Sequence, residues 1–206
     1  MFYLSYRYRN NKKQDDLKHL VSVNIFIFYY YNFNVWKLIK PTGVDLNLQF
    51  PAGWEEARRI KFAQGFTSPA PRDFVGFGPL TEPESLALYN FTLQHNFSLI
   101  LAYHTQGKEI YWQFQNYAPE NAEEIGNIFA TLSGYRLAEV PYNSSFAGYK
   151  DWFLQEYRRP GYTIEAGIGE NPLPISQFDE IYNDNIGMLV MRCCYLFILT
   201  YSCKAP

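Results

Sequence analysis

Apolar and polar positions follow regular patterns from about Gly43 onward, and these patterns predict three strands. Val44 to Phe50 alternates apolar and polar residues and is followed by Pro51, which predicts a strand that ends in a loop. Phe97 to Tyr103 is a short apolar run of the kind that forms a buried strand. Tyr162 to Glu165 is rich in β-branched and aromatic residues, so it predicts a third strand.

Helical patterns separate these strands. Thr81 and Glu84 have the spacing of a capping box, which predicts a helix from there to about His95. Residues 65–80 are rich in Gly and Pro and predict a long irregular loop. Strands that alternate with helices indicate an α/β fold with a largely buried sheet. Further helices are predicted at 121–133, just before Gly134, at 149–156 and from 176 to about 190.

Composition and charge narrow the class of protein. A chain of 206 residues with 48 % hydrophobic and 18 % charged residues is globular and has room for one domain. The formal charge of −2 gives no reason to expect binding to nucleic acid, which needs a basic surface. Ile186 to Tyr201 is apolar but is interrupted by Arg192 and is shorter than the roughly 20 residues of a membrane span, so none is predicted.

The two ends of the chain differ from the middle. Residues 1–42 form an atypical segment, because Asn, Lys, Tyr, Phe and Ile supply 23 of its first 40 positions. Codons for these residues are made largely of A and T, so one interpretation is AT-rich DNA read out of frame. The alternative is a genuine aromatic strand between Val21 and Phe33, and both interpretations stay open. Residues 191–206 form a divergent tail that holds all three cysteines, without the C-x-x-C spacing of a metal or redox site.

Three polar side chains stand in or at the ends of the predicted strands: Asn47, His104 and Glu165. In open α/β sheets, ligands bind in the crevice outside the carboxyl ends of the strands. Each residue alone is weak evidence, because a lone His is more often structural and a lone Glu is usually solvated. The sequence around them decides between these interpretations.

The order of these residues resembles the zinc carboxypeptidase family. Asp151-Trp152 and Glu165 also have the spacing found in that family. Three longer segments resemble one bacterial branch, the γ-D-glutamyl-L-diamino acid endopeptidases, which cut peptidoglycan stem peptides. They are Gly43 to Trp54 (GVDLNLQFPAGW), Phe66 to Arg72 (FTSPAPR) and Gly167 to Phe178 (GIGENPLPISQF). The resemblance covers about residues 43–190 and implies the C-terminal part of a catalytic domain. Its mixed sheet would be incomplete, with the N-terminal half missing or replaced.

The resemblance implies a role for each matching residue. His104 matches a ligand of Zn²⁺, the family's cofactor, and Glu165 matches the carboxylate that acts as general base and then general acid. Asn47 matches the residue that binds the carboxylate of the substrate. Asp45 matches the carboxylate that orients a ligand histidine. Tyr142 lies one residue out of register with the family's mobile active-site tyrosine.

Two departures from the family pattern bear on function. Leu48 stands where classical members have an Arg beside the substrate-binding Asn, which removes a bidentate contact to a simple C-terminal carboxylate and favours a diamino-acid substrate. The oxyanion-stabilising Arg expected just before Gly43 is also absent, and Lys40 is the possible substitute.

The largest departure is in the zinc site itself. The sequence contains no H-x-x-E, which supplies two zinc ligands in the family, and its three histidines are His19, His95 and His104. Two hypotheses therefore stand: a fragment of a zinc peptidase that acts on peptidoglycan peptides, or an inactive remnant that at most binds wall peptides. A carbohydrate-active module is a weaker third, because no second carboxylate pairs recognisably with Glu165. The compartment and the oligomeric state stay open.

Overall fold

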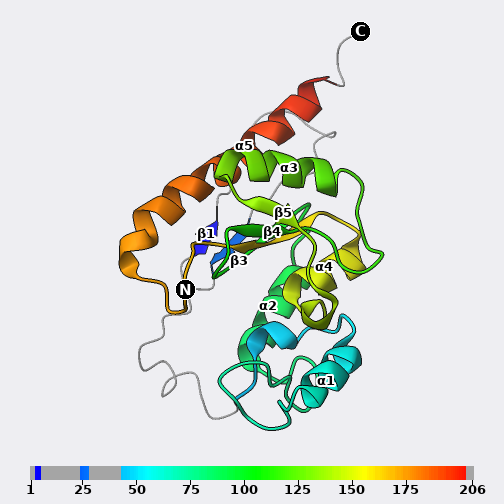
Figure 1. The fold of residues 1–206 in the computed structure, drawn as a ribbon. Helices are drawn as coiled ribbons and strands as arrows, with labels where there is room; N and C mark the ends of the chain where they lie inside the picture. Colours follow the sequence, from blue (N-terminus) through cyan, green and yellow to red (C-terminus); the bar gives the residue numbers. More distant parts are fainter. Residues whose placement is uncertain (1–2, 6–23, 28–42, 203–206) are drawn as a thin grey trace.

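The computed structural model describes residues 3–5, 24–27 and 43–202, and a mixed sheet runs through their centre (Figure 1). Its strand order is β1-β2-β3-β6-β4-β5. β1 and β4 run antiparallel to their neighbours β2 and β6, whereas β2, β3 and β6 run parallel to one another. The strands are β1 (Tyr3–Ser5), β2 (Asn24–Ile27), β3 (Ile100–His104), β4 (Glu109–Tyr111), β5 (Arg136–Ala138) and β6 (Gly161–Glu165).

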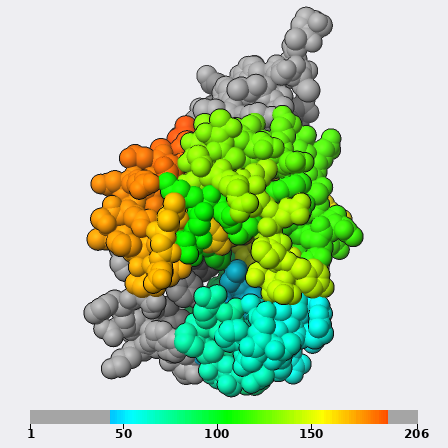
Figure 2. All heavy atoms as spheres, viewed as in Figure 1, coloured from blue at the N-terminus to red at the C-terminus, as the bar shows by residue number. Residues whose placement is uncertain are grey.

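Helices cover both faces of this sheet. Figure 1 shows α3 and α5 on one face, and α1, α2 and α4 on the other. In the space-filling view, the region of α1 is cyan at the bottom of the molecule, and the first part of α5 is orange on the left (Figure 2). The predicted α/β class, with a mixed sheet flanked by helices, is confirmed. The helices are α1 (Trp54–Ala63), α2 (Pro83–Leu93), α3 (Ala122–Ser133), α4 (Tyr149–Tyr157) and α5 (Phe178–Ser202).

The alternation of side chains along β3 divides the hydrophobic core in two. Ile100 and Ala102 belong to the cluster that contains the buried residues of α1, α2 and α4. Leu101 and Tyr103 belong to the cluster on the side of α3 and α5. Since successive side chains of a strand point to opposite faces, a residue's position in β3 or β6 fixes the face on which it lies.

The prediction of a strand at 44–50 is wrong. Leu46–Leu48 forms a short 3-10 helix, η2, because the carboxylate of Asp45 accepts a hydrogen bond from the backbone N–H of Asn47 and closes the turn. Gln49, one of the three polar residues of the pattern, is fully buried and not on a solvated strand face. Its amide nitrogen donates to the carbonyl of Val75 at 2.6 Å, so the side chain organises the loop at 65–80.

Other predicted elements lie close to the observed ones but differ at their ends. The capping box at Thr81 does not form, because the Thr81 hydroxyl donates to Gln49 Oε1 and α2 begins with Pro83 as its first residue. The last helix begins at Phe178 and continues to Ser202, past the expected end near residue 190. None of the helices in the described part of the chain is long and apolar enough to cross a membrane.

Candidate active site

His104 and Glu165 end two neighbouring strands and lie directly beside each other in the sheet. β3 and β6 are parallel, and their register pairs these two residues. His104 lies two residues after Ala102, and Glu165 lies two residues after Thr163. Since side chains alternate along a strand, both project from the face of the sheet that α4 covers. Each is half-buried. The sheet therefore brings an imidazole and a carboxylate together at its carboxyl edge.

The loops that follow the two strands are bound to each other. The N–H of Ala166 donates to the carbonyl of His104 at 2.9 Å, and the N–H of Gly107 donates to the carbonyl of Gly167 at 2.9 Å. Gly167 has a φ of +78°, and a Cβ added there would lie 2.5 Å from Leu173 Cδ1. A left-handed φ favours glycine, and a side chain here would also press on Leu173, so Gly167 suits the tight turn after Glu165.

Asn47 lies beside the first residues of α4. Its Oδ1 is 3.8 Å from the position of a Cβ built on Gly148, the residue that precedes α4. Phe153 of α4 packs over Gly161 at the start of β6. Three residues join α4 to β6, so the chain reverses direction and the N-terminal end of α4 is directed towards the carboxyl edge of the sheet. Asn47 is therefore on the same face and towards the same edge as the His104–Glu165 pair.

Asp45 joins η2 to a cluster of charges formed by α1 and the loop at 65–80. Its Oδ2 accepts a hydrogen bond from the N–H of Asp73 at 2.9 Å. Burial raises the pKa of Asp45, although its two backbone hydrogen bonds act in the opposite direction. Asp73 in turn pairs with Lys61 at 2.5 Å and with Arg72 at 2.7 Å. Burial acts to raise the pKa of Asp73, but these two cations outweigh it and hold the pKa below its usual value.

The depressed pKa of Asp73 predicts a loss of stability in acid. The unfolded carboxyl has a pKa of about 3.9, so the stabilisation is complete above that pH and is lost as the pH falls through the lower folded pKa. Urea unfolding at a series of pH values between about 5 and 2 should show a shallower decline in free energy for Asp73→Asn than for the unsubstituted chain. Parallel curves for the two proteins would contradict this assignment.

The pKa values of His104 and Glu165 shift in ways that suit a metal ligand and a proton carrier. Burial lowers the pKa of His104 to about 4, so the imidazole is neutral at pH 7, as a metal ligand must be. Burial, followed by the nearby charge of Glu109, raises the pKa of Glu165 to about 7. A carboxyl with a pKa near 7 can both take up and release a proton at neutral pH.

Glu109 is a neighbour of this pair that the sequence patterns did not indicate. Antiparallel pairing of β4 with β6 sets Glu109 opposite Glu165. Glu109 accepts hydrogen bonds from Tyr111 and Arg136, and these partners lower the pKa of Glu109, so that its carboxylate stays charged beside Glu165. β4 has three residues, too few for a recognisable period, so the only signal in the sequence was the charged residue itself.

The remaining expected site residues lie elsewhere or outside the described part. Tyr142 is 56 % exposed in the 3-10 helix η3 (Tyr142–Ser144), and its hydroxyl donates to Glu56 of α1 at 3.1 Å. In this position its described contacts are with α1 and Phe146, not with the His104–Glu165 pair. Lys40, the expected substitute for the oxyanion-stabilising Arg, lies outside the described residues.

A catalytic zinc ion takes three protein ligands and an open position. Within the described residues there is no group of three His, Cys, Asp or Glu side chains that could hold a metal ion. The neutral imidazole of His104 suits zinc, but on its own it does not form the site. These residues therefore do not fit a complete zinc centre, and no catalytic step through the metal is assigned to them.

Comparison with known proteins defines the protein family to which this chain belongs. The sequence model of the zinc carboxypeptidase family matches residues 4–187, and the chain belongs to that family. The match begins inside the segment 1–42. Zinc is the cofactor of this family, which is named for it.

One relative carries the name of the bacterial branch that the sequence motifs resemble. γ-D-Glutamyl-L-diamino acid endopeptidase 1 of Lysinibacillus sphaericus is 46 % identical over 159 residues, which are 77 % of this chain and 38 % of the relative. The YqgT protein of Bacillus subtilis (strain 168) is 46 % identical over 158 residues, which are 77 % of this chain and 41 % of that protein. The chain thus spans about two fifths of the length of these relatives.

Solved structures support the same fold. Carboxypeptidase A from Helicoverpa armigera superposes with a TM-score of 0.56 at 19 % identity, over 81 % of this chain and 44 % of that one. Bovine thrombin-activatable fibrinolysis inhibitor gives a TM-score of 0.55 at 14 % identity, over 82 % of this chain and 60 % of that one. At such identities the likeness shows the fold alone.

Proposed function

We propose that residues 43–190 form part of the catalytic unit of a zinc peptidase that hydrolyses γ-D-glutamyl–diamino acid bonds in peptidoglycan peptides. The observation that carries the proposal is the in-register pairing of His104 with Glu165 at the carboxyl edge of the sheet. The 46 % identity to an endopeptidase of that name supports the choice of substrate.

Each side chain has a distinct task in this proposal. Glu165 accepts a proton from the attacking water and transfers it to the leaving amine. Asn47 binds a carboxylate of the substrate through its amide N–H groups. His104 would contribute one ligand to zinc, and its other ligands would come from outside the described residues. A zinc ion held in this way would supply water activation and polarisation of the scissile carbonyl.

A second candidate function rests on the sequence. The absent H-x-x-E leaves a single matched ligand, which favours an inactive remnant that binds wall peptides without cutting them. In that case Asn47 would keep its role and Glu165 would have none. The two functions therefore differ in whether the protein needs the proton transfer by Glu165.

A chimera tests the proposal directly. The part of the L. sphaericus endopeptidase that precedes its region of similarity is fused to residues 43–190 of this chain. The purified chimera is assayed for zinc by mass spectrometry and for cleavage of an L-Ala-γ-D-Glu-diaminopimelate peptide. We expect one zinc per chain and cleavage, and we expect His104→Ala to abolish both.

The other outcomes separate the two functions. Stoichiometric zinc and peptide binding without cleavage would favour the wall-peptide-binding function. If the folded chimera binds neither zinc nor peptide, the peptidase proposal is lost. Tight zinc together with cleavage by the chain as it stands would rule out the inactive remnant.

A further inference from the structure

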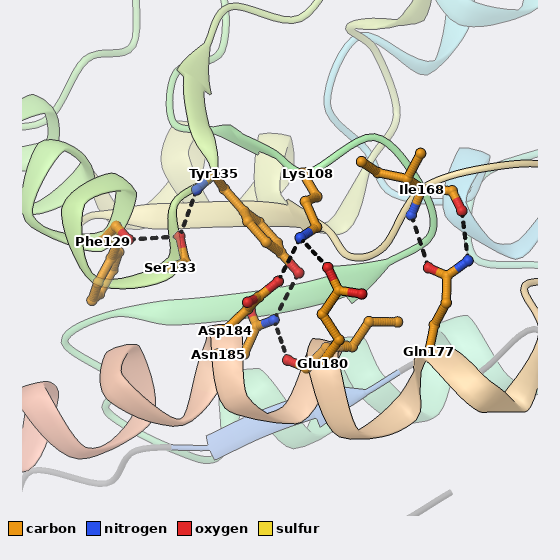
Figure 3. A network of polar contacts seen from close by, with 10 residues as sticks. Lys108, Phe129, Ser133, Tyr135, Ile168, Gln177, Glu180, Asp184 and Asn185 are labelled. Atoms are coloured by element: carbon orange, nitrogen blue, oxygen red, sulfur yellow. Dashed lines mark hydrogen bonds and ion pairs between the residues drawn. The ribbon is translucent and has the colours of Figure 1, made fainter.

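The turn that follows His104 is anchored on the face of the sheet opposite to His104 itself. Lys108 ends this turn and lies two residues before Ile110, so its side chain is on the same face of the sheet as that of Ile110. Ile110 packs on the side of α3 and α5. Its Nζ lies 2.8 Å from Glu180 Oε1 and 2.9 Å from Asp184 Oδ2 (Figure 3). The two carboxylates are one helical turn apart on α5, so a single ammonium group bridges them.

The Lys108 contact is part of a larger polar network in Figure 3. The ammonium lies 5.7 Å from the centre of the Tyr135 ring, within the range of a cation–π contact. Asn185 of α5 is 4 % exposed and donates to the Tyr135 hydroxyl at 3.0 Å. This hydrogen bond from a buried side chain fixes the Tyr135 ring, and the ring in turn contacts the Lys108 ammonium.

A second contact from α5's N-terminal side fixes the loop after Glu165. The side chain of Gln177 accepts a hydrogen bond from the N–H of Ile168 at 3.1 Å and donates to its carbonyl at 2.7 Å. Both backbone groups of Ile168 are thereby held by one amide. The two strand-end loops are thus attached to the same helical segment, one through Lys108 and the other through Gln177.

We propose that Lys108 is a positioning residue for the His104–Glu165 pair, acting by tethering the turn after β3 to α5. The tether reaches both residues through the backbone. Gly107, adjacent to Lys108, donates to Gly167, and Ala166 donates to His104. Lys108 also precedes Glu109, which pairs with Glu165 in the sheet. This inference rests on the proposed function for its catalytic meaning, whereas its structural part stands separately.

Amide hydrogen exchange on the full chain tests the structural part. The variant is Lys108→Met, which keeps the apolar stem and removes the charge. We expect the amides of Ala166 and Gly107 to exchange roughly tenfold faster, because a charge-assisted contact that held their loops is lost. The amide of Trp152 in α4, which donates to the carbonyl of Gly148, should not change. Lys108→Arg, which keeps the charge, should restore slow exchange.

Two further measurements complete the test. Arg59→Met removes an exposed ion pair on α1 and should leave all three amides unaltered. In the chimera, Lys108→Met should lower kcat and leave KM nearly unchanged, because Lys108 lies on the face of the sheet opposite to the His104–Glu165 pair. If Lys108→Met does not fold, Glu180→Gln removes the more exposed carboxylate alone and gives a milder form of the same change.

Unchanged exchange at Ala166 and Gly107 would overturn the proposal. Equal acceleration at Trp152 would also overturn it, since that result indicates general destabilisation. A chimera that cuts no peptide at all would remove the proposed function, yet the exchange rates of the full chain would still decide whether Lys108 holds the turn.

Discussion

Replacing Glu165 with Gln is expected to lower kcat of the chimeric enzyme by about 10²- to 10⁴-fold, the usual contribution of a general acid–base residue. Gln keeps the shape and polarity of the side chain but cannot accept a proton. Because Glu165 is fixed by strand pairing on both sides, we expect KM to change little. Steady-state hydrolysis of the γ-D-glutamyl peptide measures both constants.

Glu170→Gln is the matched control for this variant. Glu170 lies five residues after Glu165, in the loop that follows β6, and is exposed, so its replacement should leave kcat unchanged. If Glu165→Gln keeps kcat within a factor of a few, while zinc and substrate bind normally, Glu165 is not the proton carrier. The peptidase would then need another base.

Lys150→Met should be the most destabilising of the charge substitutions, with a loss of about 3–5 kcal/mol in the free energy of unfolding. Lys150 and Asp151 form an ion pair at 2.5 Å with side chains that are 4 % and 7 % exposed. The ammonium also donates to the carbonyl of Gln113 at 2.7 Å. Removing Lys150 leaves a carboxylate buried without its cation. Urea unfolding at pH 7 gives the free energy.

Two variants check the cause of this loss. Arg58→Met breaks an exposed pair with Glu55, 3.9 Å apart, and should cost less than about 1 kcal/mol. Adding Asp151→Asn to Lys150→Met removes the unpaired charge and should recover part of the stability. A loss for Lys150→Met no larger than that for Arg58→Met would contradict the role of burial.

The sequence patterns predicted the elements with a strong local signal. β3 and β6 are apolar or β-branched runs, and α3 ends at Gly134 with a φ of +71°, as its glycine indicated. α1 was missed because its N-cap, Gly53, has no side chain that could cap. Its buried positions Trp54, Ala57 and Ile60 do recur at helical spacing, so a search for period alone would have found it.

The candidate site was predictable only in part. The motifs marked His104 and Glu165, and their adjacency needs no more than two parallel strands of similar length. The strand assigned to Asn47 was wrong, because a side chain to backbone hydrogen bond from Asn47 to Asp45 competes with the extended conformation. Lys108 carried no signal, since its partners Glu180 and Asp184 lie more than 70 residues away in the chain.

The position of β6 also has a consequence for the order of folding. It is the last strand of the described chain, yet it lies between β3 and β4. The ribosome must add the 50 residues from Tyr111 to Gly161 before the gap can be filled, which takes roughly 3–10 s at typical rates of synthesis. During that interval both strands present unpaired edges. A nascent chain at this stage is the form on which chaperones should act, and slowing translation there should increase aggregation more than slowing it after Glu165.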